Sequence, residues 1–446
     1  MRRLGLLFLA VGLGCGPSRA PKSGEGIASS GAERMVLVIS VDGLRRDYLD
    51  DREHALPTLR RLMTEGAVAR TLTSVWPSST YPSHTTMVTG VMPARHGIFN
   101  NVVFDPYGKN DGGWYWYSSD IRVPTLWDAA RAQNVDVANV TWPVTVGAPI
   151  RWSFPQVWRS KTDEDDKLLA ALSTPSLCDE LRARNKPLPS DHRSDRVRTD
   201  AALVALDHAP RLAFVYLTDL DSAQHHDGPR SEEAWKTLET TDALLGQLIA
   251  FASTKTKRLS VVLVSDHGFA PVTTDVRPNV VLRRAGLLDV GTGDKDRDKV
   301  VRYRAVAWKS GGTAAIMGDR AVHDRVRAVF EDVARDSANG IAAVLEGEDI
   351  ERRGGFPGAL VVLQAADGMT FDESPLDPLV GPSKYKGAHG YSPDKPEMKA
   401  SLILWGDLAP KGTSLGDVRM IDVAPTIAHL ADLSFPTAEG RSLLPR

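Results

Sequence analysis

Five short stretches of the chain are rich in apolar, often β-branched residues. Each is five or six residues long, and together they are residues 35–40, 135–140, 212–217, 259–264 and 400–404. Such runs are typical of strands that are buried on both faces of a parallel sheet. Between them, apolar residues recur with helical spacing at 56–65, 125–133, 196–206 and 232–252. The alternation predicts an α/β fold with a doubly wound, mostly parallel sheet and helices on both faces.

The stretch from about 271 to 386 has a different pattern. It mixes strand-like runs with one clear helical segment, and these lie at 301–308, 313–317, 358–364 and 321–335. We interpret it as an inserted α+β subdomain within a single domain that spans residues 34–446.

The N-terminus predicts export. Arg2 and Arg3 precede a short apolar run at 4–13, which is too short to span a bilayer as a stable helix. We assign residues 1–20 to a signal peptide and 21–33 to a small, polar linker. Two processing routes are open: lipidation of Cys15, which we favour, or cleavage after Ala20. Both predict an exported protein, in the periplasm or at the cell surface.

The composition and net charge limit the classes of partner that the chain is expected to bind. The 446 residues are 42% hydrophobic and 25% charged, with a formal net charge of −2. No global field therefore attracts a nucleic-acid polymer, and a small charged substrate must be held locally. Cys15 and Cys178 are the only cysteines in the sequence, so the mature chain has no intrachain disulfide to stabilise it.

Acidic residues follow three of the predicted strands. They are Asp42, Asp221 and Asp266. Because ligands of open α/β sheets bind beyond the carboxyl ends of the strands, we expect the three side chains to converge on one crevice.

Histidines accompany these acids. His225 lies four residues after Asp221 and shares a helical face with it, whereas His226 is rotated off that face. His267 follows Asp266 directly, and His389 stands between glycines that allow close approach of a ligand. Three Asp, three His and a hydroxyl are the groups that two zinc-like ions and a nucleophile require.

The hydroxyl and the substrate contacts have several candidates. Thr80 precedes a probable helix start, where an anion is favoured, but Ser78 and Ser79 are rival hydroxyls. An amide for a phosphoryl oxygen is available at Asn101 or Asn100. Tyr81 and Trp114, the latter within the aromatic run 114–117, offer stacking surface for a nucleobase or another flat group; loop packing explains the run equally well.

The ordered motifs resemble the nucleotide pyrophosphatase/phosphodiesterase family of the alkaline phosphatase superfamily. The resemblance covers most of the chain after Glu33. The matching segments are 41–43, 57–66, 80–82, 89–90, 96–98, 124–127, 142–143, 221–229, 265–268, 389–391 and 422–426. Ser83 departs from the Asn that is usual in the family, and residues 113–120 match it poorly.

This resemblance implies an alkaline phosphatase-like fold and roles for the residues above. Thr80 would be the nucleophile, and Asn101 with the backbone N–H of Tyr81 would stabilise the charged phosphoryl oxygens. One zinc ion would be held by Asp42, Thr80, Asp266 and His267. The other would be held by Asp221, His225 and His389. The reaction implied is hydrolysis of a phosphodiester or nucleotide pyrophosphate bond in a small molecule, through a phosphoryl-threonine intermediate.

Three other functions fit the sequence less well. A phosphomonoesterase would use an extra cation over the additional phosphate oxygens, and no motif places one. A sulfatase takes its nucleophile from Cys or Ser, whereas this position is Thr80. A surface protein that binds phosphate compounds without turnover would not need so complete a set of ligands.

The predicted export signal can be tested at the mature N-terminus. We expect mass spectrometry of the exported protein to find a mature chain that begins at a lipid-modified Cys15. A mature chain that begins at Pro21 would exclude the anchor while keeping the export.

Overall fold

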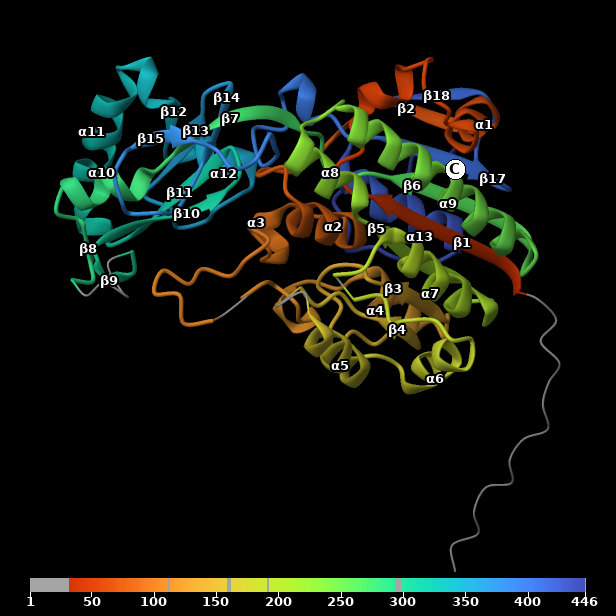
Figure 1. The fold of residues 1–446 in the computed structure, drawn as a ribbon. Helices are drawn as coiled ribbons and strands as arrows, with labels where there is room; N and C mark the ends of the chain where they lie inside the picture. The colour runs from red at the N-terminus through yellow and green to blue at the C-terminus, as the bar shows by residue number, and fades with distance from the viewer. Residues whose placement is uncertain (1–31, 111–112, 159–161, 191, 293–297, 446) are drawn as a thin grey trace, which may run out of the picture. The chain divides into compact units, whose positions relative to one another are not determined.

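The computed structural model describes residues 32–445 except 111–112, 159–161, 191 and 293–297 (Figure 1). The predicted signal peptide and Cys15 lie outside the described residues. Of the predicted linker, Ala32 and Glu33 already belong to the first strand, which runs from Ala32 to Val41.

An eight-stranded sheet forms the centre of the fold. In spatial order its strands are β18 (Thr413–Arg419), β2 (Ala67–Thr73), β17 (Leu402–Gly406), β6 (Thr256–Val264), β1 (Ala32–Val41), β5 (Leu212–Leu217), β3 (Val137–Val140) and β4 (Trp152–Phe154). All neighbouring pairs are parallel except those of β17, which runs antiparallel to β6 and β2. The predicted mostly parallel sheet is confirmed.

The two faces of the sheet bury separate apolar clusters. In β1, Met35, Leu37 and Ile39 face one cluster, whereas Val36 and Val38 face the other. The first cluster is covered by α1 (Pro57–Glu65), α6 (Pro175–Ala183), α7 (Asp195–Asp207) and α9 (Glu232–Ser253). The second is covered by α2 (Thr80–Thr89), α4 (Leu126–Ala132) and α13 (Val423–Ala431). Helices on both faces make the sheet doubly wound, as its apolar strands predict.

Smaller sheets occupy residues 270–388. One has the order β10 (Ala305–Ser310), β11 (Thr313–Gly318), β13 (Val361–Ala365) and β12 (Ile341–Leu345). Another joins β14 (Gly368–Phe371), β7 (Ala270–Val276) and β15 (Val380–Pro382), and β16 (Gly387–Ala388) pairs with β7. A two-stranded sheet joins β8 (Leu288–Val290) and β9 (Val300–Tyr303), so the predicted strand 301–308 is in fact divided between β9 and β10. None of these strands joins the central sheet.

The remaining helices are short. They are α3 (Pro93–His96), α5 (Asp163–Leu172), α8 (Asp219–Asp227), α10 (Pro278–Arg284), α11 (His323–Ala334) and α12 (Glu348–Arg353). Within the described part of the chain, every helix is too short or too polar for a bilayer crossing.

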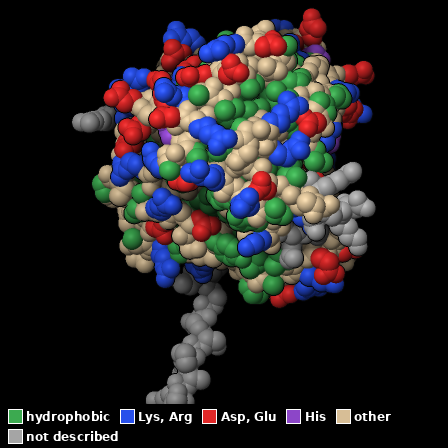
Figure 2. Space-filling model, turned by 90° about the vertical axis from the view of Figure 1, so that its left-hand side faces the viewer, with side chains coloured by type: hydrophobic (Ala, Val, Ile, Leu, Met, Phe, Trp, Pro, Cys, Tyr) green, Lys and Arg blue, Asp and Glu red, His purple; other side chains and the backbone are tan. Residues whose placement is uncertain are grey.

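The surface shown in Figure 2 carries interspersed basic and acidic side chains. Cys178 is a buried free thiol.

Candidate active site

The carboxyl ends of three adjacent strands carry the acidic residues. β1 lies between β5 and β6, and its end is in register with theirs, since Val41 pairs with Leu217 and Ser40 with Val264. Asp42 follows β1 directly, Asp266 follows β6, and Asp221 lies in the first turn of α8 after β5. The expected convergence at one edge of the sheet thus has a simple cause, the parallel register of neighbouring strands.

One group of ligand atoms is formed by Asp42, Asp266 and His267, and these atoms lie within 4.8 Å of one another. His267 Nε2 lies 3.3 Å from Asp42 Oδ1 and 3.2 Å from Asp266 Oδ2. All three side chains are buried.

Each of these two carboxylates has one oxygen held by the protein. Asp42 Oδ2 accepts a hydrogen bond from the hydroxyl of Tyr216. Asp266 Oδ1 accepts hydrogen bonds from the backbone N–H of Gly43 (3.1 Å) and of His267 (3.0 Å). The other oxygens, Asp42 Oδ1 and Asp266 Oδ2, are buried and accept no hydrogen bond from the described residues. Buried polar atoms of this kind need a partner, and a cation fits two carboxylate oxygens that face the same point.

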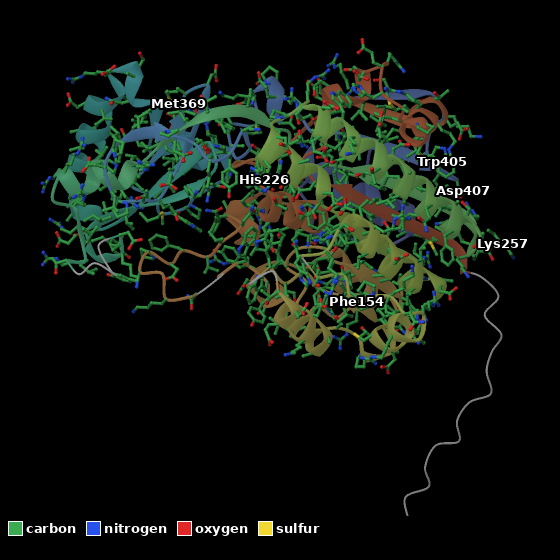
Figure 3. The ribbon with its side chains drawn as sticks, viewed as in Figure 1. Phe154, His226, Lys257, Met369, Trp405 and Asp407 are labelled. Atoms are coloured by element: carbon green, nitrogen blue, oxygen red, sulfur yellow. The ribbon has the colours of Figure 1, made fainter. Side chains whose placement is uncertain are left out.

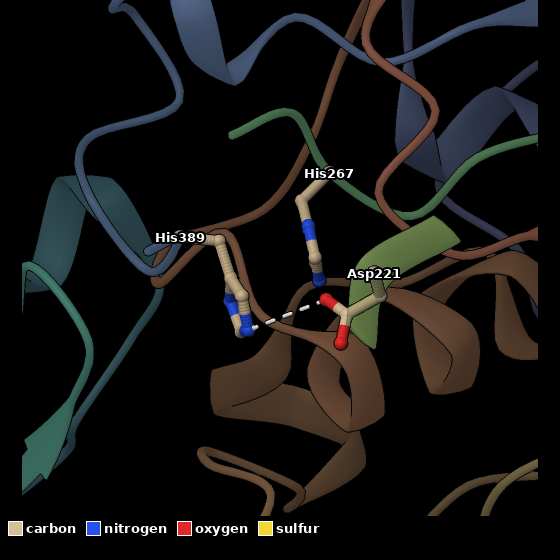
Figure 4. A group of neighbouring side chains, drawn as sticks. All are labelled: Asp221, His267 and His389. Carbon is tan, nitrogen blue, oxygen red and sulfur yellow. Dashed lines mark ion pairs between the residues drawn. The ribbon is translucent and has the colours of Figure 1, made fainter. Parts of the chain in front are cut away.

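A second group is formed by Asp221, His267 and His389 (Figure 4). Asp221 Oδ1 lies 4.0 Å from His389 Nε2, and Asp221 Oδ2 lies 3.6 Å from His225 Nε2. His267 stacks on His389 with ring centroids 3.8 Å apart, so it stands between the two groups. His226, labelled in Figure 3, is exposed and lies against Tyr385 instead.

Backbone carbonyls set the orientation of all three imidazoles. Nδ1 of His267 donates to the carbonyl of Gly268 (3.0 Å), that of His225 to Gly387 (2.9 Å) and that of His389 to Ser78 (3.2 Å). A carbonyl only accepts, so the proton is on Nδ1 and Nε2 is left to face the carboxylates. This is the orientation in which a histidine binds a metal ion.

The pKa shifts of the acidic and histidine side chains favour a cation between them. Burial raises the pKa of Asp42 well above its ordinary value, and the carboxylates of Asp266 and Asp221 raise it further. Burial also lowers the pKa of His267 well below its ordinary value and that of His389 to about 3, so both rings are neutral near pH 7. Neutral Nε2 lone pairs facing carboxylate oxygens are unfavourable without a cation between them. The residues of both groups therefore fit divalent cations.

The three candidate hydroxyls have different surroundings. Thr80 begins α2, and its Oγ1 lies 3.3 Å from His267 Nε2. Ser78 instead donates to the carbonyl of Tyr391 (2.8 Å), and Ser79 Oγ lies 2.6 Å from Ser310 Oγ. Of the three, only Thr80 reaches the groups of ligand atoms.

The two candidate amide side chains also have different hydrogen-bond partners. Asn101 Nδ2 lies 3.5 Å from Thr80 Oγ1, while its Oδ1 accepts a hydrogen bond from the backbone N–H of Tyr81 (2.9 Å). This N–H, expected to meet a phosphoryl oxygen, therefore orients Asn101 so that its NH2 group faces Thr80. Asn100 is held elsewhere, donating to the carbonyl of Lys309 (2.6 Å).

The aromatic residues near Thr80 differ in how far their side chains are exposed. Tyr81 is only 1% exposed and packs with Ile98 and Val144. Trp114 is partly exposed, with its ring centroid 5.2 Å from that of Tyr81 and 5.7 Å from that of Trp158. Trp114 and Trp158 thus offer accessible aromatic surface, whereas Tyr81 does not.

Sequence reasoning missed two supporting residues. Tyr216 lies inside β5 and reaches Asp42 across 174 residues of sequence. His84 lies inside α2, where its Nδ1 donates to the carbonyl of Thr80 (2.8 Å) and its Nε2 accepts from Ser40 Oγ (2.9 Å). Both are polar groups in otherwise buried elements, and this was the one signal that could have indicated them.

Comparisons with known proteins identify the family of the chain. The family model described as type I phosphodiesterase / nucleotide pyrophosphatase matches residues 36–392. Rat ectonucleotide pyrophosphatase/phosphodiesterase family member 3 is 26% identical over 273 residues, which are 58% of this chain and 27% of the relative. Venom phosphodiesterase 2 of Crotalus adamanteus is 26% identical over 268 residues, 58% of this chain and 30% of the relative. The chain thus spans less than a third of the length of these relatives.

Solved structures share the fold. Human ectonucleotide pyrophosphatase/phosphodiesterase 5 superposes with a TM-score of 0.67 at 20% identity and covers 91% of this chain and 97% of its own. The murine protein, in an inactive threonine-to-alanine form in complex with AMP, superposes with a TM-score of 0.66 at 20% identity, covering 92% and 97%. Since the family model matches most of the sequence, the chain belongs to the type I phosphodiesterase / nucleotide pyrophosphatase family, whose members are hydrolases.

Proposed function

We propose that this chain hydrolyses phosphodiester or nucleotide pyrophosphate bonds of small molecules, with Thr80 as the nucleophile and two zinc ions as cofactors. One observation carries the proposal. Thr80 Oγ1 lies beside His267 Nε2, to which the unpartnered oxygens of Asp42 and Asp266 also point. A hydroxyl at a helix start and next to a cation site is activated as a nucleophile.

The residues divide between two ions. Asp42, Thr80, Asp266 and His267 would hold one zinc ion. Asp221, His225 and His389 would hold the other. When bound, such a pair lowers the pKa of a coordinated hydroxyl and neutralises charge on the attacking and leaving oxygens of an in-line displacement.

The residues of the chain position the reacting groups. Thr80 Oγ1 forms a bond to phosphorus while the bond to the leaving oxygen breaks, which gives a threonine phosphate ester. Water then cleaves this ester and restores the hydroxyl. Asn101, held by the Tyr81 N–H, donates to a non-bridging phosphoryl oxygen. Trp114 and Trp158 offer a surface on which a base can stack.

Two properties of similar proteins support the proposal. The family is that of phosphodiesterases and nucleotide pyrophosphatases. The murine structure with the same fold binds AMP and is inactive as a threonine-to-alanine form. A nucleotide substrate and a threonine nucleophile fit both facts.

The nucleophile is tested by Thr80→Ala. We expect kcat for an aryl phosphodiester to fall about 10⁴-fold or more, because the neighbouring hydroxyls of Ser78 and Ser79 are held away from the ligand groups. Ser79→Ala is the matched control, since Ser79 precedes Thr80 but contacts Ser310, and it should lose far less. The measurement is the steady-state kinetics of the two variants. A kcat near the wild-type value in Thr80→Ala would refute the assignment of Thr80 as the nucleophile.

Metal content tests the ligand groups. We expect elemental analysis of the purified protein to find two divalent ions per chain, with activity lost on chelation and restored by zinc. His225→Ala should retain about one ion fewer than wild type, whereas His226→Ala should retain both, because only His225 faces Asp221. Activity that survives chelation, or equal metal loss in both variants, would contradict the site.

The charge of the substrate should affect kcat/KM. We expect kcat/KM for an aryl diester to exceed that for the monoester with the same leaving group by about tenfold or more. The monoester brings an additional negative charge, whereas the diester brings an organic group that Trp114 can contact. Both substrates should be compared at one pH and one zinc concentration, and a preference for the monoester would indicate a phosphomonoesterase.

A further inference from the structure

Gln224 is a buried polar side chain on the helix that carries Asp221 and His225. It directly precedes His225 and lies four residues after Leu220. Leu220 and Gln224 are the two buried residues of α8, and their spacing places them on one face of the helix. A fully buried amide needs hydrogen-bond partners at both its oxygen and its nitrogen, so the partners of Gln224 show what this face of α8 is attached to.

The amide nitrogen of Gln224 attaches α8 to the end of β1. Gln224 Nε2 donates to the carbonyl of Gly43 (2.9 Å), the residue that follows the candidate ligand Asp42. The backbone N–H of Gly43 in turn donates to Asp266 Oδ1 (3.1 Å). Gly43 therefore joins Gln224 to a carboxylate of the first group of ligand atoms, while Gln224 lies on the helix of the second group.

The amide oxygen of Gln224 is also held. It accepts a hydrogen bond from the hydroxyl of the buried residue Tyr48 (3.2 Å), and this hydroxyl accepts one from the backbone N–H of Arg230 (2.8 Å). Because the carbonyl of Gly43 can only accept, the NH2 end of the amide must face Gly43 and the oxygen must face Tyr48. Both ends of the side chain are thus fixed in one orientation.

The contact between Gln224 and Gly43 depends on the absence of a side chain at Gly43. The φ angle of Gly43 is +67°, and a Cβ at this position would lie 2.9 Å from Gln224 Nε2 and 3.0 Å from the ring of Phe269. Phe269 also packs edge-on against His225, with ring centroids 4.8 Å apart. The end of β1 is therefore packed closely against α8 around this hydrogen bond.

The spacing between the two groups of ligand atoms is not set by the central sheet alone. Asp42 and Asp266 follow β1 and β6, which pair up to their ends, so strand register positions the first group. Asp221 and His225 lie on α8, which is outside the sheet. Contacts between α8 and the end of β1 must therefore help to set the distance from one group to the other, and Gln224 makes such a contact.

We propose that Gln224 is a positioning residue that holds α8 against the Gly43 peptide and thereby fixes the spacing between the two groups of ligand atoms. This inference rests on the proposed function, in which each group holds one zinc ion and the ions must lie about 3.5–4 Å apart for an in-line displacement. Loss of Gln224 leaves every candidate ligand in the chain but lets α8 shift. The ion held by Asp221 and His225 is then bound more weakly.

The test variant is Gln224→Met, which keeps the length of the side chain and removes both of its hydrogen bonds. Asn279→Leu is the matched control, because Asn279 is also a buried amide with two hydrogen bonds. Its Nδ2 donates to the carbonyl of Glu373 (2.7 Å), and its Oδ1 accepts from the N–H of Ala307 (2.8 Å). Neither partner is a candidate metal ligand.

The first measurement is zinc binding to metal-free protein by calorimetry, which needs no turnover. We expect wild-type protein to bind two ions, and Gln224→Met to bind one of them about tenfold to 100-fold more weakly, the usual effect of removing a residue that orients a metal ligand. Asn279→Leu should bind both ions as tightly as wild type, even if its melting temperature falls as far as that of Gln224→Met.

A double variant identifies which ion is affected. His225→Ala protein is expected to retain only the ion of the Asp42 group. Adding Gln224→Met to it should change the affinity for that ion by less than about threefold, because the contact that is lost serves the other group. A further tenfold loss in the double variant would assign Gln224 to the Asp42 group alone and overturn its role in spacing.

Kinetics provide a second readout. At saturating zinc, kcat of Gln224→Met for an aryl phosphodiester should fall about tenfold while KM stays within about twofold of the wild-type value. The physical reason is that altered ion spacing weakens contacts made in the transition state and leaves the surfaces that bind the substrate unchanged. A rise in KM with kcat unchanged would contradict the proposal.

Other outcomes would also overturn it. Zinc affinities of Gln224→Met equal to those of wild type would do so, as would an equal weakening in Asn279→Leu, because the effect would then be one of general stability. If Gln224→Met does not fold, Tyr48→Phe takes its place. That variant removes only the hydroxyl that holds the amide oxygen and should weaken the same ion about threefold, the size of one buried hydrogen bond; an unchanged affinity would refute the role of Gln224.

Failure of the proposed function has a different signature. Wild-type protein that binds two zinc ions but cleaves no phosphodiester would refute the proposed function, while the zinc affinities of the variants would still decide the role of Gln224. Wild-type protein that binds fewer than two ions would refute both, because there would be no spacing for Gln224 to fix.

Discussion

Three hydrogen bonds from histidine Nδ1 atoms to backbone carbonyls determine the chemistry of the site. They fix His267, His225 and His389 in the tautomer whose Nε2 faces carboxylates. The acceptors are backbone atoms of Gly268, Gly387 and Ser78, which belong to three separate segments. The orientation of the ligands therefore depends on how these segments pack, and a change far from the site can misdirect an imidazole.

The segment before β16 illustrates this dependence. Gly387 accepts the hydrogen bond from His225, and the N–H of Lys386 donates to the carbonyl of His225 in return (2.9 Å). A Cβ on Gly387 would lie 2.4 Å from the carbonyl oxygen of Gln224, so only glycine allows this approach. Residues 270–388 thus bring His389 to the site and also hold His225, which comes from the other part of the fold.

The sequence predicted the buried parts of the fold better than the edges. Continuous apolar runs revealed β1, β5 and β6, because both of their faces are covered. β2 alternates buried and exposed residues and carries Arg70, and β18 is largely exposed, so neither gave such a run.

In the site, residue types and strand ends indicated the acids and histidines. Tyr216 and His84 could not be found that way, because their roles depend on contacts between elements distant in sequence.

The aromatic and the basic side chains around the candidate site have separate structural origins. Trp114 and Trp158 come from segments that precede β5, whereas Lys309 and Lys384 come from residues 270–388. Asn101 and Thr80 stand between them. A substitution at Lys309 or Lys384 changes the charge beside the candidate site without replacing a candidate metal ligand or Thr80. With this arrangement, residues outside the reacting centre can change among chains of this fold while the candidate ligands stay the same, and such contacts are what substrate selectivity depends on.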